Sequence, residues 1–202
     1  MPTTIELDDV AAIAPAGFYI ALRIGFAFPV QEINELPLEW VEHYTRSRYM
    51  LLDPALRWAY GHTGAVRWRD LDKDDPKGIL RQAAGFGLVH GLTISVFDGN
   101  AEGHRSYGSF ARKDRDFSDL EIRVLTAFLA RRHREMAPPT NLTQAELEAL
   151  RMVRNGLRLK EIAFELGVTE GAVKQRLKNA KVKLEAKTST QAAATAAQHG
   201  LI

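Results

Sequence analysis

Three stretches in the first half of the chain have the apolar pattern of strands. The stretch 17–28 is apolar and aromatic, which is typical of a buried strand. The stretches 91–97 and 105–112 flank Asp98-Gly99-Asn100, which favours a turn between paired strands. We therefore expect a sheet whose strands are largely antiparallel.

Helical signals lie between these strands and after them. Asp53-Pro54 combines an N-cap side chain with a proline suited to the first turn of a helix. Ser118 and Glu121 form a capping box before apolar residues at a spacing of 3.6. The predicted helices are 37–48, 53–60, 76–86 and a long one from about 118. The order of elements predicts the α+β class, with an α/β/α sandwich around a mainly antiparallel sheet.

The last 62 residues carry helical signals almost throughout. Thr143 and Glu146 form a second capping box, and Gly156 is suited to end that helix. A short helix over 160–166 stops at Gly167, and Thr169 is a good N-cap for a third helix. The third helix runs to about residue 184, and a fourth follows residue 189. A short helix, a glycine turn and a basic helix predict a helix-turn-helix in a small all-α domain of four helices.

Two adjacent prolines mark the boundary between these halves. Pro138 and Pro139 cannot continue a helix, and each pushes the preceding residue toward an extended conformation. We therefore predict a domain over 1–136, a linker over 137–141 and a second domain over 142–202.

Composition excludes several classes of protein. The chain has 202 residues, of which 46% are hydrophobic and 26% charged, as in an ordinary globular protein. The absence of cysteine excludes disulfide scaffolds, cysteine-ligated zinc and cysteine nucleophiles. No apolar run approaches ~20 residues and the first ten residues are acidic, so we expect neither a membrane span nor a secretory signal.

Charge is distributed unevenly between the two predicted domains. Residues 1–137 carry 17 Lys and Arg against 19 Asp and Glu, whereas residues 138–202 carry 10 against 6. The predicted third helix is cationic on one side and apolar on the other, which suits the major groove of DNA. A solvated face in a helical bundle would have the same charge pattern, so charge alone leaves both readings open.

The stretch LTQAELEALRMVRNGLRLKEIAFELGVTEGAVKQRLKNAKVKL, residues 142–184, closely resembles the DNA-binding domain of LuxR-type transcriptional regulators. The resemblance implies a bacterial cytoplasmic protein that binds double-stranded promoter DNA as a homodimer, with RNA polymerase as a further partner. Arg158, Ala172 and Arg176 depart from the family's usual serine, threonine and histidine. The DNA-binding candidates are Thr169, Lys174, Arg176, Lys178 and Lys181.

The stretch LPLEWVEHYTRSRYMLLDPALRWAYGHTGAVRW, residues 36–68, resembles the autoinducer-binding domain of the same regulators. In that domain a Trp, a Tyr four residues later, an Asp-Pro nine beyond it and a Trp fifteen beyond the Asp line a pocket for an acyl-homoserine lactone. These spacings are met by Trp40, Tyr44, Asp53 and Trp68, and a later glycine and threonine match Gly91 and Thr93.

The resemblance assigns a role to each of these side chains. Trp40 would donate its indole N–H to the lactone carbonyl, Asp53 would accept the amide N–H, and Tyr44 and Trp68 would pack against the ligand. Leu36 stands where a tyrosine is frequent, so one hydrogen bond to the ligand would be missing. The chain before Trp40 is also shorter than is usual in the family. We expect a lactone or similar small amphipathic signal, and no cofactor.

A second interpretation stays open. Trp40 and Tyr44, four residues apart on a helix, could pack in a core, and Asp53-Pro54 could only begin a helix. The first domain would then be a filled dimerisation core in a ligand-independent regulator that acts through mixed dimers.

An enzyme has little support from the sequence. Ser106 and Ser109 lack a nucleophile-elbow context, and the six histidines show no spacing typical of a metal site. The glycines of 85–91 end a predicted helix before a strand, which is the reverse of the order in a dinucleotide loop. The aspartates of 70–75 lack the glycine and glutamate of a calcium loop.

Overall fold

The computed structural model describes residues 4–24, 28–99, 103–137 and 141–202. By its contacts the chain divides into two compact units, Met1–Met136 and Ala137–Ile202. Of the predicted linker, residues 138–140 lie outside the described residues, as does Asn100 of the predicted turn. No helix within the described ranges is both long and apolar enough to cross a bilayer.

The first unit is built on a sheet of five strands, counted over the described residues, with the order β2-β1-β5-β4-β3. Each neighbouring pair is antiparallel, so the predicted fold class is confirmed. The strands are β1 Gly17–Ile24, β2 Gln31–Asn34, β3 Gly64–Arg67, β4 His90–Phe97 and β5 Arg105–Arg112.

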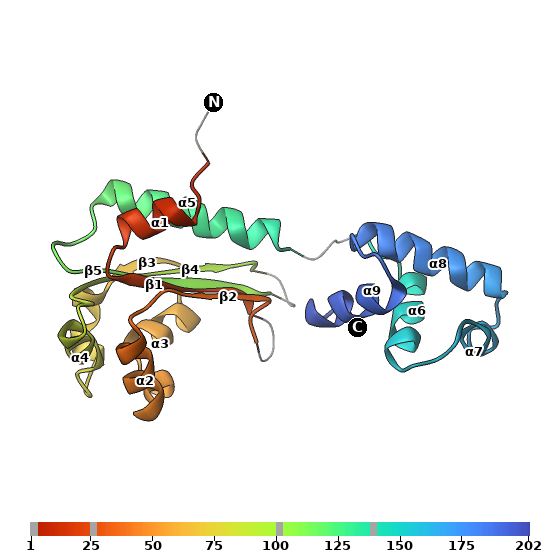
Figure 1. Cartoon of the computed structure of the whole chain (residues 1–202), viewed down its shortest axis with the longest axis horizontal. Helices are drawn as coiled ribbons and strands as arrows, with labels where there is room; N and C mark the ends of the chain where they lie inside the picture. Colours follow the sequence, from red (N-terminus) through yellow and green to blue (C-terminus); the bar gives the residue numbers. More distant parts are fainter. Residues whose placement is uncertain (1–3, 25–27, 100–102, 138–140) are drawn as a thin grey trace. The chain divides into compact units, whose positions relative to one another are not determined.

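Helices cover both faces of this sheet, as Figure 1 shows. On one face lie α1 Leu7–Ile13 and α5 Asp119–Glu135. On the other lie α2 Leu38–Arg46, α3 Pro54–Gly61 and α4 Ile79–Gly85. Two 3₁₀ turns, η1 Tyr49–Leu51 and η2 Trp68–Asp74, connect elements on that second side.

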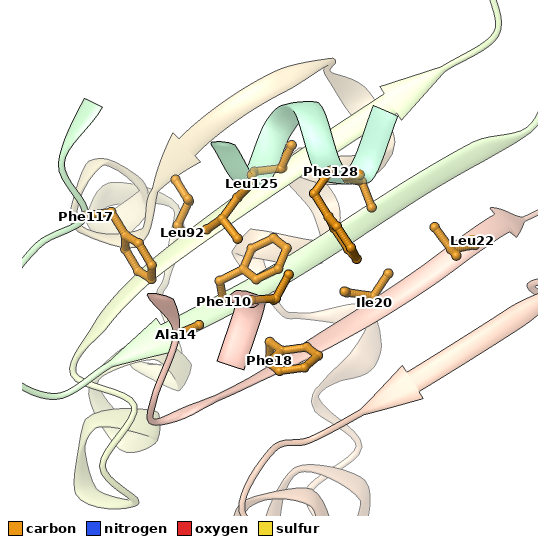
Figure 2. Close-up of a cluster of buried hydrophobic side chains, with 12 residues drawn as sticks. Ala14, Phe18, Ile20, Leu22, Leu92, Phe110, Phe117, Leu125 and Phe128 are labelled. Carbon is orange, nitrogen blue, oxygen red and sulfur yellow. The ribbon is translucent and has the colours of Figure 1, made fainter. Parts of the chain in front are cut away.

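The face of the sheet under α5 is a dry apolar core (Figure 2). Phe18, Ile20 and Leu22 of β1 point to this side together with Phe110 of β5, and all four are buried. Phe128 of α5 closes the cluster from above. Because side chains alternate along a strand, the residues between them point to the opposite face.

Predicted helix starts agree with the structure where a local cap specifies them. Both capping boxes form, at Ser118 with Glu121 and at Thr143 with Glu146. The helix predicted over 76–86 is shorter at both ends. Gly78 has φ +62°, and the carboxylate of Asp75 accepts hydrogen bonds from the first two amides of α4 at 2.8 and 2.9 Å, so the helix begins at residue 79.

Other expectations in the first unit need correction. The first strand was expected to reach residue 28. β1 covers Gly17–Ile24, with an irregular pairing between Ala21 and Ile24 where Arg23 has φ +55°. Residues 25–27 of the expected strand lie outside the described residues, and residue 28 is not in a strand. The helix predicted over 37–48 is α2, residues 38–46. Three short elements, α1, β2 and β3, were not predicted. They have 7, 4 and 4 residues, too few for a periodic pattern to stand out.

The second unit is a bundle of four helices within its described residues. They are α6 Gln144–Arg154, α7 Leu159–Glu165, α8 Glu170–Lys183 and α9 Ser189–Gln198. The buried residues Leu150, Ile162, Val173 and Leu177 belong to its core. Gly156 and Gly167, with φ +84° and +62°, end the first two helices as predicted.

Candidate ligand pocket and DNA-binding helix

A cavity of about 430 Å³ lies in the first unit, lined by residues of the sheet and of helices α2, α3 and α4. The sheet contributes the residues that alternate with the dry core, among them Tyr19 and Ala21 of β1 and Tyr107, Ser109 and Ala111 of β5. The volume is within the range typical of small-molecule sites, roughly 300–1,000 Å³.

Asp53, at the start of α3, is a charged group in the helical wall of the cavity. Its Oδ1 accepts hydrogen bonds from the amides of Ala55 at 2.8 Å and Leu56 at 3.3 Å, which begin α3. Its Oδ2 accepts from the Tyr44 hydroxyl at 2.9 Å. Burial raises the pKa of Asp53 above its ordinary value, against the lowering effect of these three hydrogen bonds. Burial and the adjacent carboxylate raise the pKa of Tyr44. Two carboxylate oxygens can accept about four hydrogen bonds, so Asp53 can accept one from a ligand.

Trp40 packs within an aromatic cluster on the same wall. Its ring centroid lies 5.6 Å from that of Tyr44, 5.5 Å from that of Phe86 and 6.5 Å from that of Tyr49, and only 5% of the residue is exposed. No residue in the described part of the chain accepts a hydrogen bond from its indole N–H. A rigid, buried aromatic wall with an unused N–H donor can orient a ligand carbonyl.

Trp68 lies flat against the sheet at the end marked by Gly91. A Cβ built on Gly91 would stand 1.7 Å from the Trp68 ring, so only glycine leaves space for the indole. The indole Nε1 donates to Thr93 Oγ1 at 3.0 Å, and Thr93 Oγ1 lies 3.2 Å from Ser109 Oγ. These contacts hold the ring against the pocket.

In the second unit, helix α8 presents a mixed polar surface. Thr169 Oγ1 accepts from the Ala172 amide at 3.1 Å and so caps the helix. Lys174 and Lys178 are exposed, whereas Arg176 and Lys181 are half-buried. Their ammonium and guanidinium groups form no ion pair with a carboxylate within the described residues, so they are available to phosphates.

Lys183 differs from these cations. Its ammonium lies 2.7 Å from Glu146 Oε2 and 2.8 Å from the Asn141 carbonyl. Burial of Glu146 acts to raise its pKa, but the Lys183 ammonium and the Thr143 amide outweigh it, and the pKa is lowered. This ion pair joins α8 to the start of α6.

Two family models match the chain on either side of its boundary. Residues 28–134 match the model described as autoinducer binding domain, and residues 140–196 match bacterial regulatory proteins, luxR family. The quorum sensing-dependent transcriptional regulator RpaR of Rhodopseudomonas palustris is 32% identical over 211 residues, covering 94% of this chain and 85% of that protein. This chain belongs to the LuxR family of quorum-sensing regulators.

Other LuxR-type proteins are similar over most of their length. The quorum-sensing regulator RhlR of Pseudomonas aeruginosa is 28% identical over 194 residues, covering 89% of this chain and 79% of RhlR. A crystal structure of SdiA from Escherichia coli aligns with a TM-score of 0.51 at 25% identity, covering 100% of this chain and 93% of that one. The family consists of transcriptional regulators, so this LuxR-type chain is not an enzyme.

The structure brings most of the predicted ligand residues of this LuxR-type chain together. Leu36, Trp40, Tyr44, Asp53 and Trp68 all line the cavity. Thr93 does not line it; the residue is fully buried beneath the Trp68 indole. Thr93 therefore positions Trp68 and reaches a ligand only through that ring.

Tyr19, Glu32, Tyr60 and Tyr107 line the cavity and were not among the candidates. The alternation in GFYIALRI, where Phe18 and Ile20 are apolar and Tyr19 lies between them, contains a signal for one of them. On α8, the exposed amides of Gln175 and Asn179 were not among the candidates either. They are hydrogen-bonded to each other at 2.8 Å, four residues apart on the helix surface.

Ser106, His133 and Asp98 have the order of contacts of a hydrolytic triad. Ser106 Oγ lies 2.7 Å from His133 Nδ1, and His133 Nε2 lies 2.8 Å from Asp98 Oδ1. Ser106 is fully buried, its Oγ accepts from the Arg23 amide at 2.9 Å, and the cavity does not reach it. The network therefore joins β5, the hairpin and α5, and no substrate can approach the hydroxyl.

Proposed function

We propose that the first unit binds an acyl-homoserine lactone or a similar small amphipathic signal, and that the second binds promoter DNA as a homodimer. The observation that supports ligand binding most strongly is the buried Asp53 carboxylate in the wall of an apolar and aromatic cavity that Trp40 also lines, with an indole N–H that no described residue accepts. The two groups form an acceptor and a donor, which suits the adjacent N–H and C=O of an acyl amide and a lactone.

The roles proposed for the other residues follow from their positions. Tyr44 fixes the Asp53 carboxylate, Trp68 and Leu36 supply apolar contact, and Thr93 holds Trp68 in place. Each buried CH₂ of an acyl chain would contribute roughly 0.8 kcal/mol. Ligand binding would stabilise the folded state, and through it the dimer that presents two copies of α8 at a fixed spacing.

The DNA part of the proposal assigns Lys174, Arg176, Lys178 and Lys181 to DNA contacts and Thr169 to the cap that fixes the start of α8. At the promoter, which in a bacterium lies in the cytoplasm, the bound dimer would meet RNA polymerase. Gln175 and Asn179 are amides of the kind that read adenine edges in the major groove, and they share the exposed side of α8 with the lysines.

A thermal-shift experiment tests the ligand. We expect one acyl-homoserine lactone of a panel, at ~100 times its dissociation constant, to add roughly 2.7 kcal/mol, or about 5–10 °C in Tm. Asp53→Asn, which keeps an oxygen for the helix cap, should abolish the shift while the ligand-free protein stays folded. Tyr44→Phe, which leaves the carboxylate in place, should only reduce it. A folded dimer that responds to no lactone would favour the alternative, an orphan regulator acting through mixed dimers.

A salt titration tests the helix. Lys178→Ala should weaken binding to promoter DNA and reduce the slope of log K against log salt by about 1. Lys113→Ala, an exposed lysine of the first unit, is the matched control and should leave the slope unchanged. An unaltered slope for Lys178→Ala removes that lysine from the interface.

A further inference from the structure

The cavity has a second polar end, separate from Asp53. Along β5 its floor runs from Ala111 through Ser109 to Tyr107, four residues, or about 13 Å. Ala111 belongs to the cluster of Trp40 and Trp68. Along α3 the roof runs from Asp53 to Tyr60, seven residues, or about 10 Å. Tyr60 and Tyr107 meet, with ring centroids 6.3 Å apart, so both walls place them away from the tryptophans.

Tyr19 and Glu32 complete this second end. Tyr19 lies beside Tyr107, with ring centroids 5.6 Å apart. Glu32 is on the edge strand β2, paired with Ala21, and its carboxylate faces the cavity from an exposed position. We call Tyr19, Glu32, Tyr60 and Tyr107 the tyrosine-glutamate end. An acyl chain that starts at Asp53 and extends along the floor finishes there.

The charged group of this end is a hydrogen-bond acceptor. A carboxylate has no proton to donate, so Glu32 can only accept from a ligand. The rings of Tyr19 and Tyr107 pack against each other in the same part of the cavity wall. Burial, and then Glu32, raises the pKa of Tyr19 to about 12, so its hydroxyl stays protonated. A methyl terminus placed here would remove water from these oxygens and supply no hydrogen bond in return.

We propose that the tyrosine-glutamate end selects a signal whose acyl chain carries a hydroxyl group at the end remote from the lactone. The hydroxyl donates to the Glu32 carboxylate, and the phenol rings of Tyr19, Tyr60 and Tyr107 enclose the last carbons of the chain. Glu32 is then a specificity-determining residue of the pocket. This inference rests on the proposed lactone-sensing function.

Paired ligands test it on the full-length protein. Octanoyl-, decanoyl- and dodecanoyl-homoserine lactone are each compared by calorimetry with the analogue hydroxylated at the terminal carbon. We expect the hydroxylated partner of the best-fitting chain to bind about tenfold more tightly, the effect of one hydrogen bond to a charged acceptor. Glu32→Leu should reverse this preference. Glu42→Leu, an exposed glutamate of α2 outside the cavity wall, should retain it.

The outcomes separate the two proposals. Equal binding of both partners, stronger binding of the plain chain, or an unchanged preference in Glu32→Leu would overturn the selectivity while leaving the lactone sensor intact. Binding of neither partner by a folded protein would overturn both. Tm without ligand shows whether Glu32→Leu is folded; should it unfold, Glu32→Gln takes its place, with the preference expected to shrink and an unchanged preference again counting against the proposal.

Discussion

The two faces of the sheet are made by the same strands and have opposite properties. On one face, Phe18, Ile20 and Phe110 pack with side chains of α5 in a buried apolar cluster (Figure 2). On the other, Tyr19 and Tyr107 line an open space beneath α2 and α3. Because adjacent residues of a strand point to opposite faces, we expect a substitution on the first face to change stability and one at the next residue to change ligand binding.

The largest effect should come from the dry face. Phe110→Ala removes a fully buried ring and should lower the free energy of unfolding by about 3–5 kcal/mol. Ser109→Ala, its neighbour on the cavity face, removes one hydroxyl contact with Thr93 and should cost no more than about 1 kcal/mol. Urea denaturation of both variants measures the difference, and comparable losses of unfolding free energy would contradict the assignment of stability to the face under α5.

A smaller effect should come from the contact of Gly91 with Trp68. Gly91→Ala places a methyl group inside the indole, so the ring must move, at a cost of about 1–3 kcal/mol. Affinity for the proposed lactone should fall by about tenfold or more, since the displaced indole loses its hydrogen bond to Thr93 and no longer lines the cavity in the same position. Gly61→Ala, where no atom lies within 4 Å of the added carbon, should leave affinity unchanged.

The smallest effect is the dependence of stability on pH. Stability is lost toward acid pH on the face under α5 and toward alkaline pH on the cavity face. Burial, and then the Arg23 cation, lower the pKa of His133 on the dry face, against the raising effect of Asp98. The unfolded state therefore binds more protons, and stability falls as pH drops below about 6.5. On the cavity face the pKa of Tyr19 is raised to about 12, so its contribution is complete below about pH 10 and is lost as pH rises from 10 toward 12.

Two variants separate these titrations. His133→Gln should reduce the slope of the acid limb of the stability profile. Tyr19→Phe should reduce the slope of the alkaline limb without abolishing it, because the pKa values of Tyr44 and Tyr107 are raised as well. Each variant should leave the other limb in place. Unfolding free energies measured across the pH range would show this. A profile in which His133→Gln leaves the acid slope intact would place the acid sensitivity in other groups, such as the Asp98 carboxylate.

The sequence predicted elements that are specified locally. Asp53, Ser118 and Thr143 each cap a helix through amides two or three residues away, so their signals are complete within a few residues. The edge strand β2 depends on pairing with β1, a distant part of the chain, and only Ile33 of its four residues is a large apolar one. Its existence follows from tertiary contact, which local pattern does not contain.

The residues of the pocket were likewise predictable only where they lie close together in the sequence. Trp40, Tyr44 and Asp53 come from one continuous stretch, so their spacing identifies them. Tyr19, Glu32 and Tyr107 come from three strands, and they meet only because β1 lies between β2 and β5. For Thr93 the sequence pattern was misleading. Its position matched the expected spacing, but its hydroxyl accepts a hydrogen bond from the Trp68 indole and does not line the cavity.

The hydrogen bonds of the two Asp53 oxygens matter for any attempt to change which small molecule the first unit binds. One oxygen accepts from the first amides of α3 and the other from the Tyr44 hydroxyl, so a substitution that removes these acceptors disturbs the start of the helix as well as the contact proposed for the ligand. Glu32 is exposed on the edge strand β2, and within the described residues its side chain caps no helix. Libraries for altered response should therefore leave the carboxylate at residue 53 constant and vary the opposite end of the cavity.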